Sequence, residues 1–340
     1  MSLLSVLAET MMVFLNLLLV VFAVITMDAQ AQESAVLRMV QTIPLPNVEG
    51  RIDHMAVDVK GQRLFIAALG NNTIEVVDLQ SGKRTQSIGG FSEPQGVSFI
   101  PEFNKLLVAN GKTGACDILD GSSFERIRSV KFPDDADNIR YDASGQRVYV
   151  GYGNGGLGII DAKNGNHIGD IPLDAHPESF QLGKSAPRIF VNLPDSKKIA
   201  VVNRESRTVI TAWATGGASA NYPMALDETH HRLFVGFRKP AKLSVYDTDS
   251  GKIVANLDSV GDADDIFYDS SRQRIYIAGG DGFLSIFQQL DPDHYQPVTK
   301  IPTAAGARTA LFVAELNRIY LAVPHRGGQR AEARVYSTQP

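Results

Sequence analysis

A short β-strand pattern recurs seven times along the chain and constrains the fold more than any other feature. The copies are RLFIAAL, KLLVANG, RVYVGYG, RIFVNLP, RLFVGFR, RIYIAGG and RIYLAVP, which begin at residues 63, 105, 147, 188, 232, 274 and 318. The intervals between these starts are 42, 42, 41, 44, 42 and 44 residues. Each copy follows an apolar or alternating run and precedes two further runs, the last of which is more polar. Four short strands per unit at this spacing are typical of propeller blades.

The two ends of the chain indicate how such a ring would close. The seventh unit has only three strand patterns, of which EARVYST is the last, whereas AVLRMVQTIPL before the first unit has no blade of its own. Pairing the N-terminal strand with the last blade would remove the exposed seam of an open ring. We therefore predict an all-β fold, a seven-bladed β-propeller of four-stranded antiparallel blades, closed by the N-terminal strand.

Composition excludes some functional classes. The formal net charge is -4 and the pI is about 6.0, which give no electrostatic reason for a polyanionic partner, so we expect no nucleic acid binding. Cys116 is the single cysteine, which excludes an internal disulfide framework and a multi-cysteine zinc site.

The N-terminal region differs from the repeats. Residues 11–27 are almost entirely apolar, and Ala-Gln-Ala at 29–31 has the small-x-small form of a signal-peptidase site. No basic residue precedes Arg38, and seventeen apolar residues are at the short limit for a membrane span. We predict that 1–31 is a signal peptide or, if uncleaved, a membrane anchor, and that 32–340 is one propeller domain. The protein would then be exported, periplasmic or extracellular, with membrane contact only through an uncleaved N-terminal segment.

The repeat resembles that of a known family. RLFIAAL followed by TIEVVDLQSGK, and RLFVGFR followed by KLSVYDTDSGK, are similar to the seven-bladed YVTN-type propellers, which include exported bacterial YncE-like proteins. The resemblance extends from about Ala35 to Thr338 and implies the fold. Members have been associated with cell-surface, binding and enzyme-like roles, and related propellers range from lactonases to cofactor-dependent oxidoreductases. The resemblance therefore leaves the function open.

Charged residues precede the first strand of most units, as in GRIDHMAVD at 50–58. The first strand of a blade is innermost, so these segments converge on one mouth of the central channel. In register they supply the following candidate binding residues: Arg51, Asp53, His54, Glu93, Gln95, Asp135, Asp137, Asn138, His176, Glu178, Asp262, Asp264, Asp265 and Arg308. Eight of these are carboxylates and two are arginines. Such clustering costs energy unless a cation, a proton or water offsets it, and should raise some of the carboxylate pKa values. The alternative is a solvated rim, since loops between blades are usually polar.

Three functions are compatible with this mouth. The first is a binding module for a cationic or hydroxyl-rich small molecule, or for an envelope protein or peptide. The second is a divalent-metal-dependent hydrolase similar to lactonase-type propellers, with calcium, magnesium or manganese held by a subset of Asp53, His54, Asp137, Glu178 and Asp264. The third is an envelope protein interaction scaffold. No residue is an assured nucleophile or general base, so no catalytic residue is assigned and the binding module is preferred.

Overall fold

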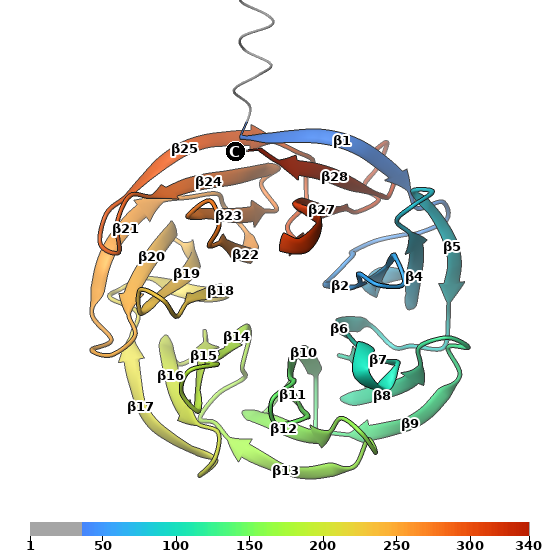
Figure 1. Ribbon diagram of the computed structural model, residues 1–340, viewed down its shortest axis with the longest axis horizontal. Coiled ribbons are helices and arrows are strands. Elements are labelled where there is room, and N and C mark those ends of the chain that lie inside the picture. Colours follow the sequence, from blue (N-terminus) through green and yellow to red (C-terminus); the bar gives the residue numbers. More distant parts are fainter. Residues whose placement is uncertain (1–35, 340) are drawn as a thin grey trace, which may run out of the picture.

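The computed structural model describes residues 36–339, which form seven four-stranded antiparallel sheets arranged in a ring (Figure 1). This confirms the predicted seven-bladed β-propeller. The predicted signal peptide or anchor at 1–31 lies outside the described residues. Within the described part of the chain, no helix has the length and apolarity needed to cross a bilayer.

Each blade runs outward from the axis in chain order. Blade one contains β2 (Met55–Asp58), β3 (Arg63–Ala68), β4 (Thr73–Asp78) and β5 (Lys83–Ile88). Blade two contains β6 (Pro94–Ile100), β7 (Lys105–Asn110), β8 (Ala115–Asp120) and β9 (Arg126–Lys131). Blade three contains β10 (Ala136–Asp142), β11 (Arg147–Tyr152), β12 (Gly156–Asp161) and β13 (His167–Pro172). Blade four contains β14 (Phe180–Leu182), β15 (Arg188–Leu193), β16 (Lys198–Asn203) and β17 (Thr208–Ala214).

The remaining blades keep this order until the ring closes. Blade five contains β18 (Ser219–Asp227), β19 (Arg232–Lys239), β20 (Ala241–Asp247) and β21 (Ile253–Asp258). Blade six contains β22 (Ala263–Asp269), β23 (Arg274–Gly279), β24 (Phe283–Gln289) and β25 (Tyr295–Pro302). Blade seven contains β26 (Ala310–Val313), β27 (Arg318–Val323), β28 (Glu332–Thr338) and, outermost, β1 (Leu37–Pro44). Three 3-10 turns, η1 (Leu69–Asn71), η2 (Pro101–Phe103) and η3 (Ala314–Leu316), lie between strands.

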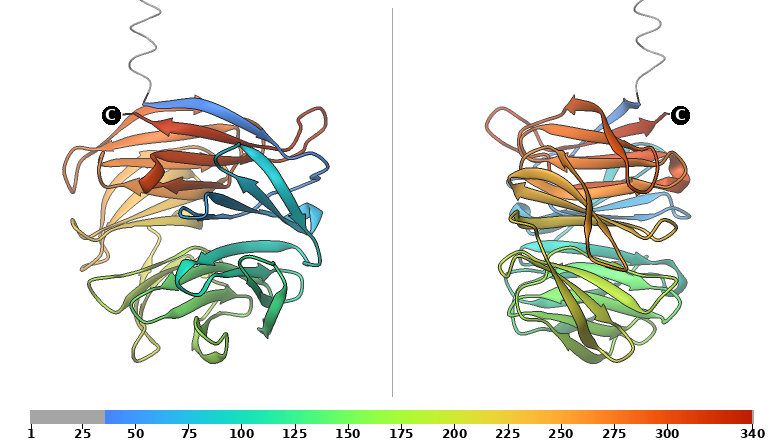
Figure 2. Two further views of the ribbon diagram at one scale, coloured as in Figure 1. Left: turned by 45° about the vertical axis from the view of Figure 1, so that its right-hand side comes forward. Right: turned by 90° about the vertical axis from the view of Figure 1, so that its left-hand side faces the viewer.

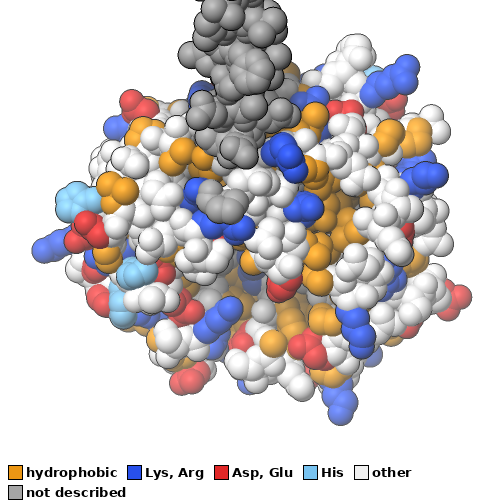
Figure 3. All heavy atoms as spheres, turned by 45° about the horizontal axis from the view of Figure 1, so that its top comes forward, with side chains coloured by type: hydrophobic (Ala, Val, Ile, Leu, Met, Phe, Trp, Pro, Cys, Tyr) orange, Lys and Arg blue, Asp and Glu red, His pale blue; other side chains and the backbone are white. Residues whose placement is uncertain are grey.

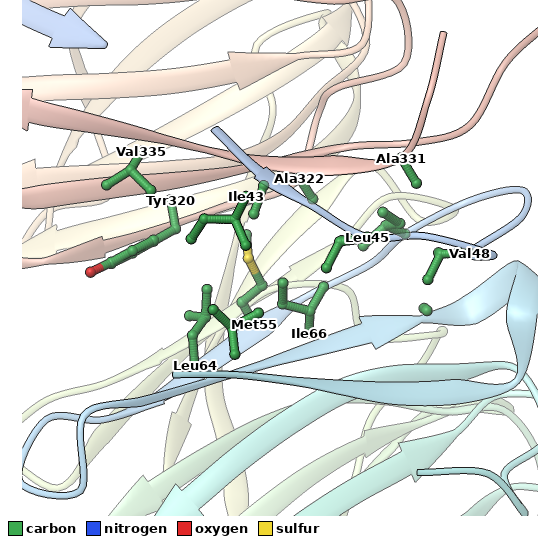
Figure 4. Packing of buried hydrophobic residues seen from close by; sticks show 14 of the residues in the cluster. Ile43, Leu45, Val48, Met55, Leu64, Ile66, Tyr320, Ala322, Ala331 and Val335 are labelled. Atoms are coloured by element: carbon green, nitrogen blue, oxygen red, sulfur yellow. The ribbon is translucent and has the colours of Figure 1, made fainter. Parts of the chain in front are cut away.

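The two ends of the described chain meet in blade seven. Strand β1 pairs antiparallel with β28, as the blue and red ribbons in Figure 1 show, and the register places Leu37 opposite Thr338. Ile43 and Leu45 are each 1% exposed and pack in one cluster with side chains of blades one and seven (Figure 4). The predicted closure is therefore confirmed, and apolar packing reinforces the backbone pairing.

The hydrophobic core is a ring of interfaces between neighbouring blades. The second and third strands are buried on both faces, as in β3 and β4, because each blade lies between two others, whereas the outer strands β5 and β9 are mostly exposed. One cluster, for example, joins Tyr149 of blade three to Phe180 and Val191 of blade four. Figure 2 shows the stacked blades from the side. This arrangement leaves the axis free for polar side chains.

Candidate functional site

One repeat position supplies the wall of a pocket at the channel mouth. The equivalent residues of the seven blades all line this pocket, which has a volume of about 270 Å³: Asp53, Gln95, Asp137, Glu178, Tyr222, Asp264 and Arg308. The remaining lining residues are Arg51, His54, Asp135, His176 and Arg238. Five acidic side chains thus face three arginines. The predicted convergence of distant segments on one ring is what the structure shows.

The backbone bends where each inner strand begins. Glu93, Asp135 and Asp262, at equivalent positions of blades two, three and six, have left-handed φ values of 53°, 27° and 50°. The strand pairing is irregular just beyond these residues in β6, β10 and β22. Irregularities of this kind re-aim side chains and are common beside active sites. They direct the side chains two residues later, Gln95, Asp137 and Asp264, towards the mouth.

Ten of the fourteen predicted residues line the pocket, and four do not. The side chain of Glu93 is 50% exposed and lies 3.9 Å from Lys112. Asp262 is 41% exposed and paired with arginines. Asn138 and Asp265 line an adjoining pocket of about 340 Å³, and His54 lines both pockets. A purely solvated rim does not describe this region, because Asp53 and Asp137 are 1% and 6% exposed.

Blades five, six and seven carry a connected ion-pair network. Arg308 donates through Nη1 to both carboxylate oxygens of Asp262 at 3.1 and 3.0 Å, and its Nε lies 3.0 Å from Oδ2 of Asp264. Arg238 donates through Nη2 to Oδ1 of Asp264 at 2.5 Å. The Arg238 guanidinium also covers the Tyr222 ring, with Cζ 3.8 Å from the ring centroid. These contacts compensate Asp262 and Asp264.

The charged residues of blade one extend the network. Nη2 of Arg51 lies 2.8 Å from Oδ2 of Asp53. His54 lies between two carboxylates, with Nε2 3.7 Å from Asp53 and Nδ1 3.4 Å from Asp265. Asp265 also accepts a hydrogen bond from the backbone N–H of Ala310 at 2.8 Å. We call Arg51, Arg238 and Arg308 with these partners the arginine side of the mouth.

Blades three and four form a different part of the mouth, which we call the carboxylate side: Asp137, His176 and Glu178. His176 Nε2 lies 4.0 Å from Oε1 of Glu178. The buried Oδ1 atom of Asp137 has no hydrogen-bond partner among residues 36–339. Within this part of the chain the structure shows no ion pair between an arginine and either carboxylate. Unlike the arginine side, this side lacks a direct cationic partner.

Burial changes the acid–base behaviour of the mouth. It raises the pKa of Glu178, and the neighbouring carboxylate of Asp137 raises it further. Burial likewise raises the pKa of Asp137, although His54 opposes the rise. Burial alone would lower the pKa of His54, but Asp265 and Asp53 outweigh this effect and raise it to about 10. The sequence led us to expect such a rise from mutual repulsion, whereas burial is its largest cause here and neighbouring carboxylates add to it.

The predicted metal-ligand set is divided between the two sides. Asp53, His54 and Asp264 are engaged with charged neighbours on the arginine side, whereas Asp137 and Glu178 face His176. The ligand atoms of these last three residues all lie within 4.8 Å of one another. Among the described residues of the mouth, this subset alone has three such ligand atoms clustered this closely.

Sequence reasoning missed two residues of the pocket wall. Tyr222 occupies the same repeat position as Asp53, so the alignment of blades contained the signal that would have selected it. Arg238 lies near the end of β19, outside the compared positions, and no pattern in the sequence marks it. With Arg238 the mouth has three arginines instead of the two predicted from the sequence, so its net charge is less negative than expected.

The face of the molecule shown in Figure 3 has no cluster of like charges comparable to that of the mouth. There, basic and acidic side chains are interspersed, and no broad region carries one sign. At the mouth of the channel, by contrast, charged side chains are both clustered and buried.

Comparisons with known proteins support the fold. No family model matches the chain, and no curated protein matches it. Among solved structures, a chain of hydrazine synthase from Kuenenia stuttgartiensis has a TM-score of 0.71 at 16% identity, over 81% of this chain and 94% of that one.

A second similar chain comes from the mitotic checkpoint complex. Its TM-score is 0.75 at 13% identity, and the match covers 89% of this chain and 92% of that one. Both identities are so low that the likeness concerns the fold alone, and a fold shared by such different assemblies hosts many functions. The chain is a seven-bladed β-propeller.

Proposed function

We propose that this protein is an exported binding protein whose channel mouth takes a small cationic ligand. The observation that supports the proposal is the buried, unpartnered Oδ1 atom of Asp137 beside Glu178. A buried carboxylate without a partner destabilises the fold unless a proton or a cation compensates it. A ligand with a positive charge would supply that compensation at the carboxylate side.

The pocket suits a small ligand better than a protein segment. Its volume of about 270 Å³ is near the lower limit for small-molecule sites. An ammonium group offers three donors and no acceptor, which matches the acceptor atoms of Asp137 and Glu178. The Tyr222 ring and the arginine side would contact the rest of the ligand.

Export and family membership are further parts of the proposal. The apolar segment at 11–27 and the Ala-Gln-Ala triplet at 29–31 support secretion. The repeat motifs support membership of the YVTN-type, YncE-like propellers. Expression in a bacterial host should yield an envelope protein whose N-terminus lies near Gln32, and N-terminal sequencing would check this. An intact Met1 in a cytoplasmic fraction would contradict export.

A binding experiment tests the ligand class. We expect at least one small primary amine or amino sugar to raise the midpoint of thermal unfolding, whereas the matched neutral alcohol or sugar should not. Asp137→Asn should abolish the shift because it removes the charge that the ligand compensates. Glu93→Gln removes a carboxylate of the exposed rim that does not line the pocket, and should leave the shift unchanged. Equal responses in both variants, or no response to any cation, would refute the proposal.

A metal-dependent hydrolase is the second candidate. The observation that favours it is the group Asp137, His176 and Glu178, since catalytic zinc sites commonly use three protein ligands and keep a position for water or substrate. Hydrolysis of a lactone that requires added metal and is lost in His176→Ala would support it. The scaffold function predicted from the sequence stays a prediction.

A further inference from the structure

The carboxylate side combines donor types that one ion can share. Asp137 and Glu178 offer carboxylate oxygens and His176 offers an imidazole nitrogen, all within 4.8 Å of one another. Two ligands of one tetrahedral zinc ion, each at about 2.0–2.2 Å, lie about 3.3–3.6 Å apart. The donors are therefore wider apart than a bound ion would hold them, and rotations of the partly exposed His176 and Glu178 side chains would have to bring them together.

We infer that Asp137, His176 and Glu178 bind one divalent transition-metal ion, which is the cation that the mouth takes. The inference rests on the proposed function and names the class of its ligand. Its second support, independent of the spacing, is the Asp137 side chain, which is 6% exposed, lines the pocket and leaves Oδ1 without a partner. Oδ2 of Asp53 and Oδ2 of Asp264 also lack a hydrogen bond, but each lies within 3.0 Å of an arginine nitrogen. Oδ1 of Asp137 has no such neighbour among the described residues, so this atom indicates a missing partner.

The donor set favours a transition metal over calcium or magnesium. Calcium and magnesium take oxygen ligands almost exclusively, whereas imidazole suits zinc, copper, iron and nickel. The sequence predicted calcium, magnesium or manganese because carboxylates of several blades were expected to converge on one ion. Because Asp53 and Asp264 are paired with arginines, His176 and two carboxylates remain, and the preferred ion changes accordingly.

Asp137, His176 and Glu178 lie on different backbone segments of blades three and four. Asp137 belongs to β10, and the backbone N–H of Glu178 donates to the carbonyl of Asn192 in β15 at 3.0 Å. Three protein ligands leave at least one coordination position for water or an organic ligand in the pocket. The guanidinium of Arg51 lines the same pocket and adds a second charged group to it.

Metal titration tests the inference. The purified protein, treated with a chelator and then freed of it, should bind one equivalent of zinc in isothermal titration calorimetry. Cobalt, used as a spectroscopic probe, should give a visible absorption spectrum that changes when His176 is replaced. His176→Ala and Asp137→Asn should each weaken zinc binding at least about tenfold, which corresponds to about 1.4 kcal/mol.

Two control variants separate a built site from general attraction. Glu93→Gln removes one negative charge from the exposed rim of the same mouth. His294→Ala removes an exposed histidine that lies 2.8 Å from Asp291 on blade six. Both should bind zinc like the unmodified protein. If Asp137→Asn fails to fold, as circular dichroism would show, His176→Ala still decides the question, because His176 lies outside the strands and is one-fifth exposed.

The outcomes distinguish this inference from the proposed function. No binding of zinc, or equal binding in His176→Ala and the unmodified protein, would overturn the metal site. If an organic ammonium ligand then still bound in an Asp137-dependent manner, the proposed function would stand without the metal. If neither zinc nor an ammonium ligand bound, both would fail.

Discussion

The position of Asp137 depends on a glycine of the neighbouring blade. A Cβ atom at Gly96 would lie 2.1 Å from the carbonyl oxygen of Asp137 and 3.1 Å from the side chain of Ile139. Backbone at such a distance cannot accommodate even a methyl group without moving. Gly96 therefore lets strand β10 approach blade two closely and sets the place of the Asp137 carboxylate.

Replacement of Gly96 by alanine tests this role. We expect Gly96→Ala to lower the free energy of unfolding by about 1–3 kcal/mol through overpacking, and to weaken ligand binding at Asp137. Urea unfolding measures the first effect and calorimetry the second. Gly89→Ala is the matched control, because nothing lies within 4 Å of a Cβ there. Its expected effect is within about 0.5 kcal/mol. Equal losses in the two variants would contradict the close-approach argument.

Strand β1 is the element that closes the ring, because it pairs with β28 in the last blade. Its outer positions are exposed, whereas Leu37 and Ile43 are buried against blade seven and its neighbours. Without β1, the edge of β28 would be free to pair with another chain. The ring is thus closed by backbone hydrogen bonds between β1 and β28 and by a few apolar contacts, without a covalent bond.

Truncation of Ile43 tests the contribution of β1. Ile43→Ala should lower the free energy of unfolding by about 2–5 kcal/mol, because it leaves a cavity between the first and last blades. Val40→Ala is the matched control in the same strand, since Val40 is 41% exposed, and should change stability by less than about 0.5 kcal/mol. Chemical denaturation compares the two. A small effect of Ile43→Ala would mean that the ring does not depend on packing at this seam.

For the whole molecule, the mouth links stability to pH. The pKa of His54 rises to about 10, and burial raises the pKa values of Asp137 and Glu178. Each of these groups holds its proton more tightly in the folded state than in the unfolded chain. The stability that they contribute is fully present below their unfolded pKa values and is lost as the pH rises through the folded values.

The free energy of unfolding should therefore fall as the pH increases from about 4, near the unfolded values of the two carboxyl groups, towards about 10, the raised pKa of His54. Each proton involved gives a slope of up to about 1.4 kcal/mol per pH unit. Urea unfolding at a series of pH values measures the slope. Asp137→Asn should reduce the slope mainly below about pH 7 and His54→Gln mainly above about pH 6.5, whereas His294→Ala should leave it unchanged. A stability that is constant or rises over this range would disprove the coupling.

The blade count, the order of strands and the closure could all be predicted from the sequence. Alternation of apolar and polar residues over a few positions is a local property, and its repetition at 41 to 44 residues leaves few other ways to bury the strands. The same register brought Asp53, Asp137, Glu178 and Asp264 to a common depth. Equivalent positions in equivalent blades must face the same axis, so this part of the mouth also followed from the repeat.

The pairing of charges across the mouth was decided only by the tertiary structure. Arg238 reaches Asp264 from the second strand of the adjacent blade, which leaves Asp137, His176 and Glu178 without an arginine in direct contact. These partners belong to different blades, and their distances depend on local bends at Glu93, Asp135 and Asp262 and on how closely the blades pack. A periodic pattern in the sequence specifies which way a strand faces, but it carries no information on distances between side chains that meet only across the channel.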